Sequence, residues 1–355
     1  MNKCRIYLLL ILSFLVLSCD KNKKDEETSF SKVDLQKNIG KNIILPGYRT
    51  LIDEIDSLEE YHTSFVASPS QDLFEQVRLK WYDTYLQWNR VSMFEFGPAL
   101  DMGLKGALGL FPNDTSKILN NIASNSYDLT TVSNTDAVGL HAFDFLLYRR
   151  NAFEDYKNDI NYQNYIQALI DKAQSELNYV YNQWNLTYLD EFSNSTGTAS
   201  TSAFSMFVNE FIKSYEETKW TKVGIPSGKQ TLGIIQKNYI ETRLSKKSLT
   251  ILFENLKAIK RCFNGENIDE VNGVGFDDYL TDLDRNDLVN SINNSLDEII
   301  NDVNQITNDF ETEIETNPSS IEAIYTKIHN LTVSLKTDMT SAFGVLITYQ
   351  DNDGD

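Results

Sequence analysis

The chain has 355 residues, 32 basic against 51 acidic side chains, and a formal net charge of −19 at pH 7. Because so acidic a protein repels polyanions, we expect no nucleic-acid partner. Only three cysteines occur, which excludes zinc sites built on several thiolates. The length exceeds what one hydrophobic core normally serves, so two subdomains are expected.

The first 18 residues have the form of an export signal. Lys3 and Arg5 precede an apolar run over residues 6–12, and small or apolar residues lead to Cys19. This pattern resembles a bacterial lipoprotein signal, in which cleavage falls before the cysteine and the cysteine is lipidated. An ordinary signal peptide or a lone membrane anchor is the alternative. We expect residues 1–18 to be a signal peptide and lipid on Cys19 to hold the protein at the cell envelope, on the periplasmic side of the outer membrane or at the cell surface.

The segments that flank the expected domain are polar. Residues 19–30 are mostly charged, which predicts a disordered tether, and their acidic cluster 25–27 also resembles surface-export signals of some lipoproteins. Residues 347–355 form an acidic tail. Loss of residues 1–18 would leave Cys262 as the single unmodified cysteine, and its apolar helical surroundings predict an inert core thiol.

The first helices of the domain are predicted by apolar residues spaced three or four apart. One begins near Lys32 and contains Pro46, which should kink it. A second follows the turn at 68–70 and runs to about Arg90, with an aromatic stripe that we interpret as core. It ends in Phe-Glu-Phe-Gly-Pro, where Glu95 points either to solvent or into a site.

The middle of the chain is predicted to contain one long, irregular segment followed by two helices. Residues 99–134 are rich in Gly and Asn and predict a partly structured segment with a short helix over 116–123. A helix over 137–148 follows, with Asp136 as its expected N-cap, and then a long helix over 162–184.

The second half predicts another set of helices after a Ser- and Thr-rich segment at 193–202. Periodic apolar residues place four helices at 203–218, 244–263, 287–307 and 319–342. Few alternating patterns argue for strands, so the predicted class is all-α. We expect an N-terminal helical bundle over 31–195 and a C-terminal bundle over 196–346.

One stretch, residues 137–148, places two possible metal-binding or catalytic side chains among apolar residues. His141 and Asp144 are three residues apart, so a helix presents imidazole and carboxylate on nearly one face, which suits a divalent metal or a general base. Gly139 lets backbone approach closely. The other two histidines, His62 and His329, have polar neighbours and are expected at the surface.

Several stretches together resemble the imelysin family, whose members are periplasmic or lipid-anchored and whose name comes from an insulin-cleaving peptidase activity. The resemblance covers nearly the whole expected mature chain and is carried by residues 42–48, 81–98, 139–148, 224–226 and 240–245. It implies two helical bundles that face each other across a cleft lined by the His141 helix.

The resemblance also implies a ligand set. The family signature is GxHxxE, proposed to bind metal, and here Gly139 and His141 match while Asp144 replaces the glutamate. Aspartate is one methylene shorter and reaches less far, although it remains an oxygen ligand. By resemblance, Glu95 and Glu241 would approach His141 and Asp144. The expected cleft lining also includes Gly139, Ser245 and Asp101.

Three functions fit these residues. The first is binding of iron or another divalent metal in metal or haem acquisition, with uptake partner proteins at the envelope; nitrogen and oxygen donors do not choose among iron, zinc, manganese and copper. The second is a metal-dependent peptidase, which the family name implies, although the chain has no HExxH motif. The third is a non-metal protein whose cleft binds a peptide, a glycan or a partner.

Overall fold

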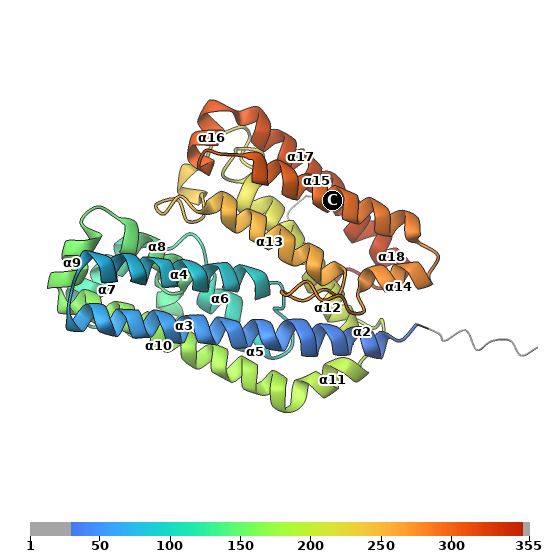
Figure 1. The fold of residues 1–355 in the computed structure, drawn as a ribbon, viewed down its shortest axis with the longest axis horizontal. Coiled ribbons are helices and arrows are strands. Elements are labelled where there is room, and N and C mark those ends of the chain that lie inside the picture. The colour runs from blue at the N-terminus through green and yellow to red at the C-terminus, as the bar shows by residue number, and fades with distance from the viewer. Residues whose placement is uncertain (1–29, 351–355) are drawn as a thin grey trace, which may run out of the picture. The chain divides into compact units, whose positions relative to one another are not determined.

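The computed structural model describes residues 30–350, and the predictions for residues 1–29 and 351–355, including lipidation of Cys19, lie outside them. From residue 32 onward the described chain forms one compact unit. Every regular element between residues 30 and 350 is helical and none is a strand, which confirms the all-α class (Figure 1). The predicted boundary between bundles at 195 and 196 stays a prediction. None of the described helices is long and apolar enough to cross a membrane.

The first half of the chain contains α-helices with π- and 3₁₀-helical segments (η) between them. In chain order they are α2 (Lys32–Asn38), η1 (Ile39–Ile44), α3 (Leu45–Ala67), α4 (Gln71–Val91), α5 (Pro98–Met102), α6 (Leu104–Leu108), α7 (Thr115–Ser124), η2 (Val132–Ala137), α8 (Leu140–Tyr148), α9 (Ala152–Asn158), α10 (Ile160–Gln183), η3 (Trp184–Tyr188) and α11 (Leu189–Asn194).

The second half continues with another series of helices. They are α12 (Ala203–Glu217), η4 (Thr218–Gly224), η5 (Lys237–Tyr239), α13 (Ser248–Phe263), α14 (Phe276–Asp282), α15 (Asn286–Gln305), α16 (Phe310–Thr316), α17 (Pro318–Val333), η6 (Ser334–Met339) and α18 (Thr340–Phe343).

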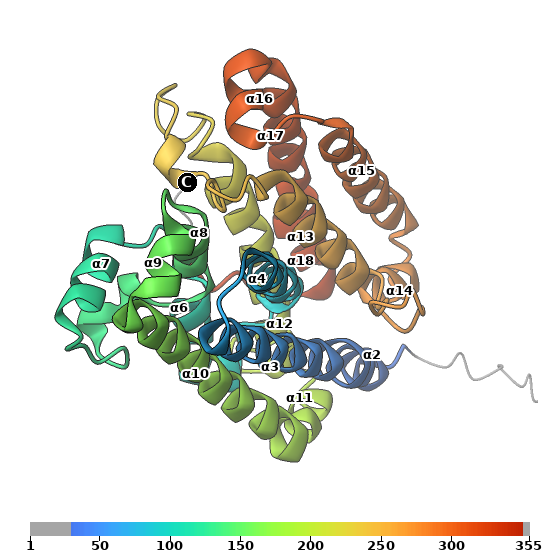
Figure 2. The ribbon, with the colours of Figure 1, turned by 60° about the vertical axis from the view of Figure 1, so that its left-hand side comes forward.

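Among the long helices of the first half, α3 packs along both α4 and α10 (Figures 1 and 2). Their boundaries follow from capping side chains. Ser70 accepts the backbone N–H of Leu73 at the start of α4, and Asp159 accepts that of Asn161 at the start of α10. The aromatic stripe of α4 is buried, as its spacing predicted.

Pro46 changes the helix that contains it. A π-helical segment, η1, precedes the proline, which occupies the first turn of α3. Residues 32–67 are nonetheless continuously helical, and the N–H of Leu45 donates to the carbonyl of Gly40, five residues back. This wider π-helical turn accommodates the proline, which has no N–H to donate, within the helix.

In the second half, α13, α15 and α17 pack in sequence, and α13 also contacts α4. Two polar contacts join α4 to α13: Arg90 forms an ion pair with Glu254 at 2.9 Å, and Asn255 donates to the carbonyl of Asn89 at 3.2 Å. Helix α13 begins at Ser248 instead of 244, because residues 241–246 form turns.

Helix α8, which carries His141, begins differently from its prediction. Its N-cap is Gly139, with φ of 87°, whereas Asp136 lies in η2 and pairs with Lys117, so the predicted N-cap was wrong. A Cβ on Gly139 would lie 2.8 Å from the carbonyl oxygen of Leu108, so the residue must be glycine both for its backbone angle and for space. This packing seats the start of α8 directly against α6.

The prediction for His62 was also wrong. Its side chain is buried, and its Nδ1 atom lies 2.5 Å from the hydroxyl of Tyr156. The Tyr156 hydroxyl provides the hydrogen-bond partner of His62 Nδ1 inside an aromatic cluster. The polar neighbours of His62 in the sequence do not indicate this contact. His329 is exposed, and Cys262 is buried, as predicted.

Candidate functional site

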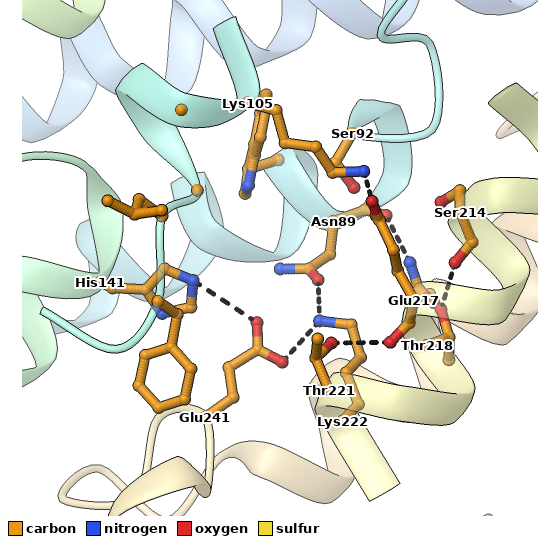
Figure 3. Close-up of a pocket in the computed structure, with 16 residues that line it drawn as sticks. Asn89, Ser92, Lys105, His141, Ser214, Glu217, Thr218, Thr221, Lys222 and Glu241 are labelled. Atoms are coloured by element: carbon orange, nitrogen blue, oxygen red, sulfur yellow. Dashed lines mark hydrogen bonds and ion pairs between the residues drawn. The ribbon is translucent and has the colours of Figure 1, made fainter. Parts of the chain in front are cut away.

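A cavity of about 410 Å³ lies beside His141. Its lining comes from α4, from the segment 105–111, from α8, from the end of α12 with η4, and from α13, so distant parts of the chain meet there (Figure 3). The residues that line it are Trp88, Asn89, Ser92, Lys105, Gly106, Gly109, Leu110, Phe111, His141, Ser214, Glu217, Thr218, Thr221, Lys222, Glu241 and Asn255.

Three polar side chains, from Tyr85, His141 and Glu241, converge beside this cavity; His141 and Glu241 line it, and Tyr85 lies buried behind them. The Tyr85 hydroxyl donates to Oε1 of Glu241 and lies 2.9 Å from Nε2 and 3.1 Å from Nδ1 of His141. The Nε2 atom of His141 is 3.8 Å from the same Oε1, too far for a direct hydrogen bond. A phenol, an imidazole and a carboxylate thus lie around one point, and we call them the Tyr85–His141–Glu241 triad.

Two lysines balance the two glutamates that line the cavity. The Lys222 ammonium lies 2.5 Å from Oε2 of Glu241 and 2.8 Å from Oδ1 of Asn89 (Figure 3). Further along the cavity Lys105 is paired with Glu217. Because each ammonium has a carboxylate partner, the lining carries no net charge when His141 is neutral.

Burial sets the protonation of the triad. It lowers the pKa of His141 to about 4, against the opposing Glu241 carboxylate, so the imidazole is neutral near pH 7. A neutral imidazole carries a proton on one ring nitrogen and a lone pair on the other. Burial and then the Glu241 carboxylate raise the pKa of Tyr85 well above its ordinary value.

Glu241 is ionised although it is buried. Burial alone would raise the pKa of this carboxyl, but the Lys222 ammonium, His141 and the hydrogen bonds from Lys222 and Tyr85 outweigh it and bring the pKa below its ordinary value. The triad therefore offers one negative charge and one imidazole lone pair at neutral pH.

Asp144, the other polar residue of the signature, is directed elsewhere. Its Oδ1 accepts the backbone N–H of Ser245 at 2.9 Å, and its Oδ2 accepts that of Leu244 at 3.0 Å. Its carboxylate does not line the cavity. Asp144 thus ties down the turn that directly follows Glu241, and in this way it positions a member of the triad.

Glu95 lies apart from the triad as well. Both of its carboxylate oxygens lie 3.1 Å from the backbone nitrogen of Lys105, near the start of α6. Burial raises the pKa of Glu95 to about 7, although this hydrogen bond and the Lys105 charge oppose the shift. The residue is buried, as an inward-directed carboxylate would be, yet it caps α6 and does not line the cavity.

The other residues of the expected cleft lining have structural surroundings. Gly139 packs against the backbone of α6, Ser245 donates its N–H to Asp144, and Asp101 is exposed on α5. None of them lines the cavity.

The predicted set of four ligands is not assembled. Within residues 30–350 no group of three or more His, Cys, Asp or Glu side chains is close enough to hold a metal. Of that set, the structure brings His141 and Glu241 together, and the third donor beside them is the phenol of Tyr85. A nitrogen and two oxygens fit a metal such as iron by their chemistry, whereas Asp144 and Glu95 are engaged by backbone amides.

Tyr85 and Lys222 were missed by the sequence reasoning. Tyr85 belongs to the aromatic stripe of α4 and was interpreted as core. Its ring is indeed buried, but its hydroxyl contacts His141 and Glu241. A buried tyrosine needs a partner for its hydroxyl, and that requirement was the available signal. Nothing in the sequence around Lys222 indicated its pairing with Glu241.

The solved structures that resemble this chain include the following two. One is described as a candidate iron-regulated protein A precursor from Parabacteroides distasonis, with a TM-score of 0.75, 16% sequence identity, and coverage of 90% of this chain and 97% of the other. The second is an imelysin-like protein from Psychrobacter arcticum, with a TM-score of 0.72, 14% identity, and the same two coverages, 90% and 97%. At these identities the likeness shows the fold.

No curated protein matches the sequence. The family model described as Imelysin matches residues 44–337, which include both the His141 helix and the Glu241 turn. A match over this much of the chain agrees with the order of motifs in the sequence and with the helical fold. The chain therefore belongs to the imelysin family.

Proposed function

We propose that this protein binds iron at the Tyr85–His141–Glu241 triad and serves in iron acquisition at the cell envelope. The single observation that carries the proposal is the convergence of a phenol, an imidazole and a carboxylate at the edge of the cavity, which the imidazole and the carboxylate line. One structural neighbour is described as an iron-regulated protein, which is consistent with the proposal.

The spacing of the three donors supports a shared metal. Bonds of roughly 2.0–2.2 Å around one ion place neighbouring donor atoms roughly 3–3.5 Å apart. Tyr85 and His141 are 2.9 Å apart, and His141 and Glu241 are 3.8 Å apart, so shifts of less than about 1 Å would bring these atoms to such spacings. The hydroxyl of Tyr85 and Oε1 of Glu241, now in a hydrogen bond, would separate when a metal replaces the phenol proton, which would be released to solvent.

The donor types favour iron over softer metals. No thiolate lines the cavity, and carboxylate and phenolate are anionic oxygen donors that suit hard cations. The imidazole is held neutral, the form in which it donates to a metal. When bound, iron would supply Lewis acidity or redox capacity, while the chain supplies one nitrogen and two oxygens.

Iron binding by matched variants tests the proposal. We expect the protein, stripped with chelator and titrated anaerobically with ferrous chloride, to bind one iron per chain. His141→Ala and Tyr85→Phe should each weaken binding by roughly tenfold or more, which corresponds to about 1.4 kcal/mol. Tyr82→Phe is the control, because Tyr82 is on the same helix but its ring lies against Lys247, whereas the Tyr85 hydroxyl contacts His141 and Glu241.

The outcomes separate clearly. Binding of one iron that is lost in the two triad variants and kept in Tyr82→Phe supports the proposal. An iron-free wild type, or equal affinity in all four proteins, overturns it. Circular dichroism of each variant shows whether the helical fold is retained.

The place of this function in the cell is a further part of the proposal. We propose that lipid on Cys19 anchors the chain to the outer membrane and that an uptake protein receives the iron. The pattern of residues 1–19 supports it. Labelling with a radioactive fatty acid should mark the wild type and spare Cys19→Ser; label on both proteins would overturn the anchor.

A further inference from the structure

The cavity is much larger than an ion. Its volume of about 410 Å³ compares with about 30 Å³ for one water in the liquid, and of the triad only His141 and Glu241 line it. Most of the remaining lining surface is apolar, from residues such as Trp88, Leu110 and Phe111, but it also carries two ammonium groups, two carboxamides and several hydroxyls. There is therefore room, and hydrogen-bonding capacity, for a small polar molecule beside a bound ion.

Lys222 acts as the built-in counter-cation of the triad. Its ammonium is largely buried, with 13% of the side chain exposed, and it is 2.5 Å from Oε2 of Glu241, while Oε1 of the same carboxylate faces Tyr85. One carboxylate thus serves both the triad and the lysine. A cation bound by the triad would share the negative charge that now faces Lys222 alone.

The charges of the cavity lining indicate that a bound metal cation would need a further negative charge beside it. With the pairs Lys222–Glu241 and Lys105–Glu217 the lining is neutral, so a bound metal cation leaves a net positive charge. The other partner of Lys222, Oδ1 of Asn89, is uncharged. A buried ammonium without a full counter-charge is costly, and an anion in the cavity would remove that cost.

We propose that the cavity takes a small carboxylate-type anion together with the metal, and that Lys222 holds it. The inference rests on the proposed iron site and deepens it, because it names the class of second ligand. By linkage, the anion strengthens metal binding by the same factor as the metal strengthens anion binding. Without an anion, Lys222 competes with the metal for Glu241.

The anion has two sources, which are a free anion that joins the bound metal and a chelate that enters as a preformed complex. In both, carboxylate oxygens face Lys222. Malonate is a suitable probe because it is small and dianionic. It is added either after the iron or already mixed with it; both orders reach the same equilibrium, so the rate at which the complex forms in each order distinguishes the sources.

Calorimetric titration of malonate measures the coupling directly. For the full-length protein we expect malonate to bind at least tenfold more tightly in the presence of one equivalent of ferrous iron than in its absence. Lys222→Met keeps the length and packing of the stem but removes the ammonium. It should abolish this coupling and should bind iron alone more tightly than the wild type does.

Lys105→Met is the matched control, since Lys105 also lines the cavity and is paired with a glutamate, yet lies away from the triad. It should keep the coupling. Equal malonate affinity with and without bound iron in the wild type overturns the inference, and that measurement needs no variant to fold. Coupling retained in Lys222→Met also overturns it.

The experiment distinguishes failure of the proposed iron site from failure of the proposed anion site. A wild type that binds no iron refutes the proposed function, whereas a wild type that binds iron without any effect of malonate refutes only the anion. Coupling that is present at equilibrium but forms faster from premixed iron and malonate identifies the chelate as the source and supports the inference.

Discussion

At the scale of single residues, Asp144 differs most from the role that the family signature implies. Both of its oxygens accept backbone N–H groups of the turn at 244–245. We expect Asp144→Asn to lower the free energy of unfolding by about 1–3 kcal/mol, because one amide then loses its acceptor. Urea unfolding measures this loss.

The same variant tests the ligand role of Asp144. If Asp144 only positions the Glu241 turn, Asp144→Asn still binds one iron per chain, with a smaller loss of affinity than Glu241→Gln. If Asp144 is a direct ligand, the two variants lose iron to the same extent. Equilibrium dialysis against labelled iron compares them.

The raised pKa of Glu95 should make the free energy of unfolding depend on pH. Burial raises its pKa to about 7 from the ordinary 4.5, so the folded protein holds this proton more tightly than the unfolded chain. The cost of ionising it is absent below pH 4.5 and grows to about 3 kcal/mol as the pH rises to 7. Glu95→Gln, which keeps an acceptor for Lys105, should therefore stabilise at pH 8 and have little effect near pH 4.

Chemical unfolding of wild type and Glu95→Gln at a series of pH values checks this. The difference in unfolding free energy should open between pH 4.5 and 7. A difference that stays constant with pH would show that Glu95 is ionised as readily in the folded protein as in the unfolded chain.

At the scale of elements, the start of α8 depends on one glycine. Gly139 has a positive φ, and an added Cβ would lie 2.8 Å from the Leu108 carbonyl oxygen. Gly139→Ala should cost roughly 2–4 kcal/mol from strain and overlap together. Gly106→Ala is the control, because a Cβ added there would meet nothing within 4 Å, and it should change stability by less than about 1 kcal/mol.

Thermal denaturation of the two alanine variants compares them directly. A large fall in melting temperature for Gly139→Ala alone agrees with the packing of α8 on α6. Similar melting temperatures for both variants would contradict it.

The elements also show what could be predicted from the sequence. Periodic apolar residues located α4, α10, α15 and the helical class, because a buried stripe is a local property of each helix. The N-cap of α8 was misplaced because Asp136 is used by Lys117 and not by the helix. The burial of His62 depends on Tyr156, 94 residues away, and its polar neighbours in sequence do not report that contact.

The candidate site was predictable only in part, because contacts between residues that are distant in the sequence leave no local pattern. The signature residues indicated His141, and the family resemblance indicated Glu241. The phenol of Tyr85 and the ammonium of Lys222 reach these residues through tertiary packing, and Tyr85 is separated from Glu241 by 156 residues. Spacing along one helix cannot encode such a meeting.

At the scale of the whole molecule, we expect residues 32–350 to unfold in one cooperative transition. They belong to one compact unit, and aromatic rings of the first half pack on the second: Phe96 and Phe192 lie 5.7 and 5.8 Å from Phe207. Separating the halves at residue 195 would expose these rings, at a cost of about 1–3 kcal/mol each.

Differential scanning calorimetry tests this expectation. A single peak whose calorimetric and van't Hoff enthalpies agree fits one folding unit. Two resolved peaks, or a stable fragment over 31–195, would show that the two predicted bundles fold independently.

The visible absorption spectrum of the iron-loaded protein in air tests the central claim most directly. A tyrosine phenolate bound to ferric iron gives a charge-transfer band that carboxylate and imidazole ligands do not give. We expect this band in the wild type and in Tyr82→Phe, and its loss in Tyr85→Phe. A colourless iron-loaded wild type, or a band that survives in Tyr85→Phe, would contradict iron binding at the Tyr85–His141–Glu241 triad.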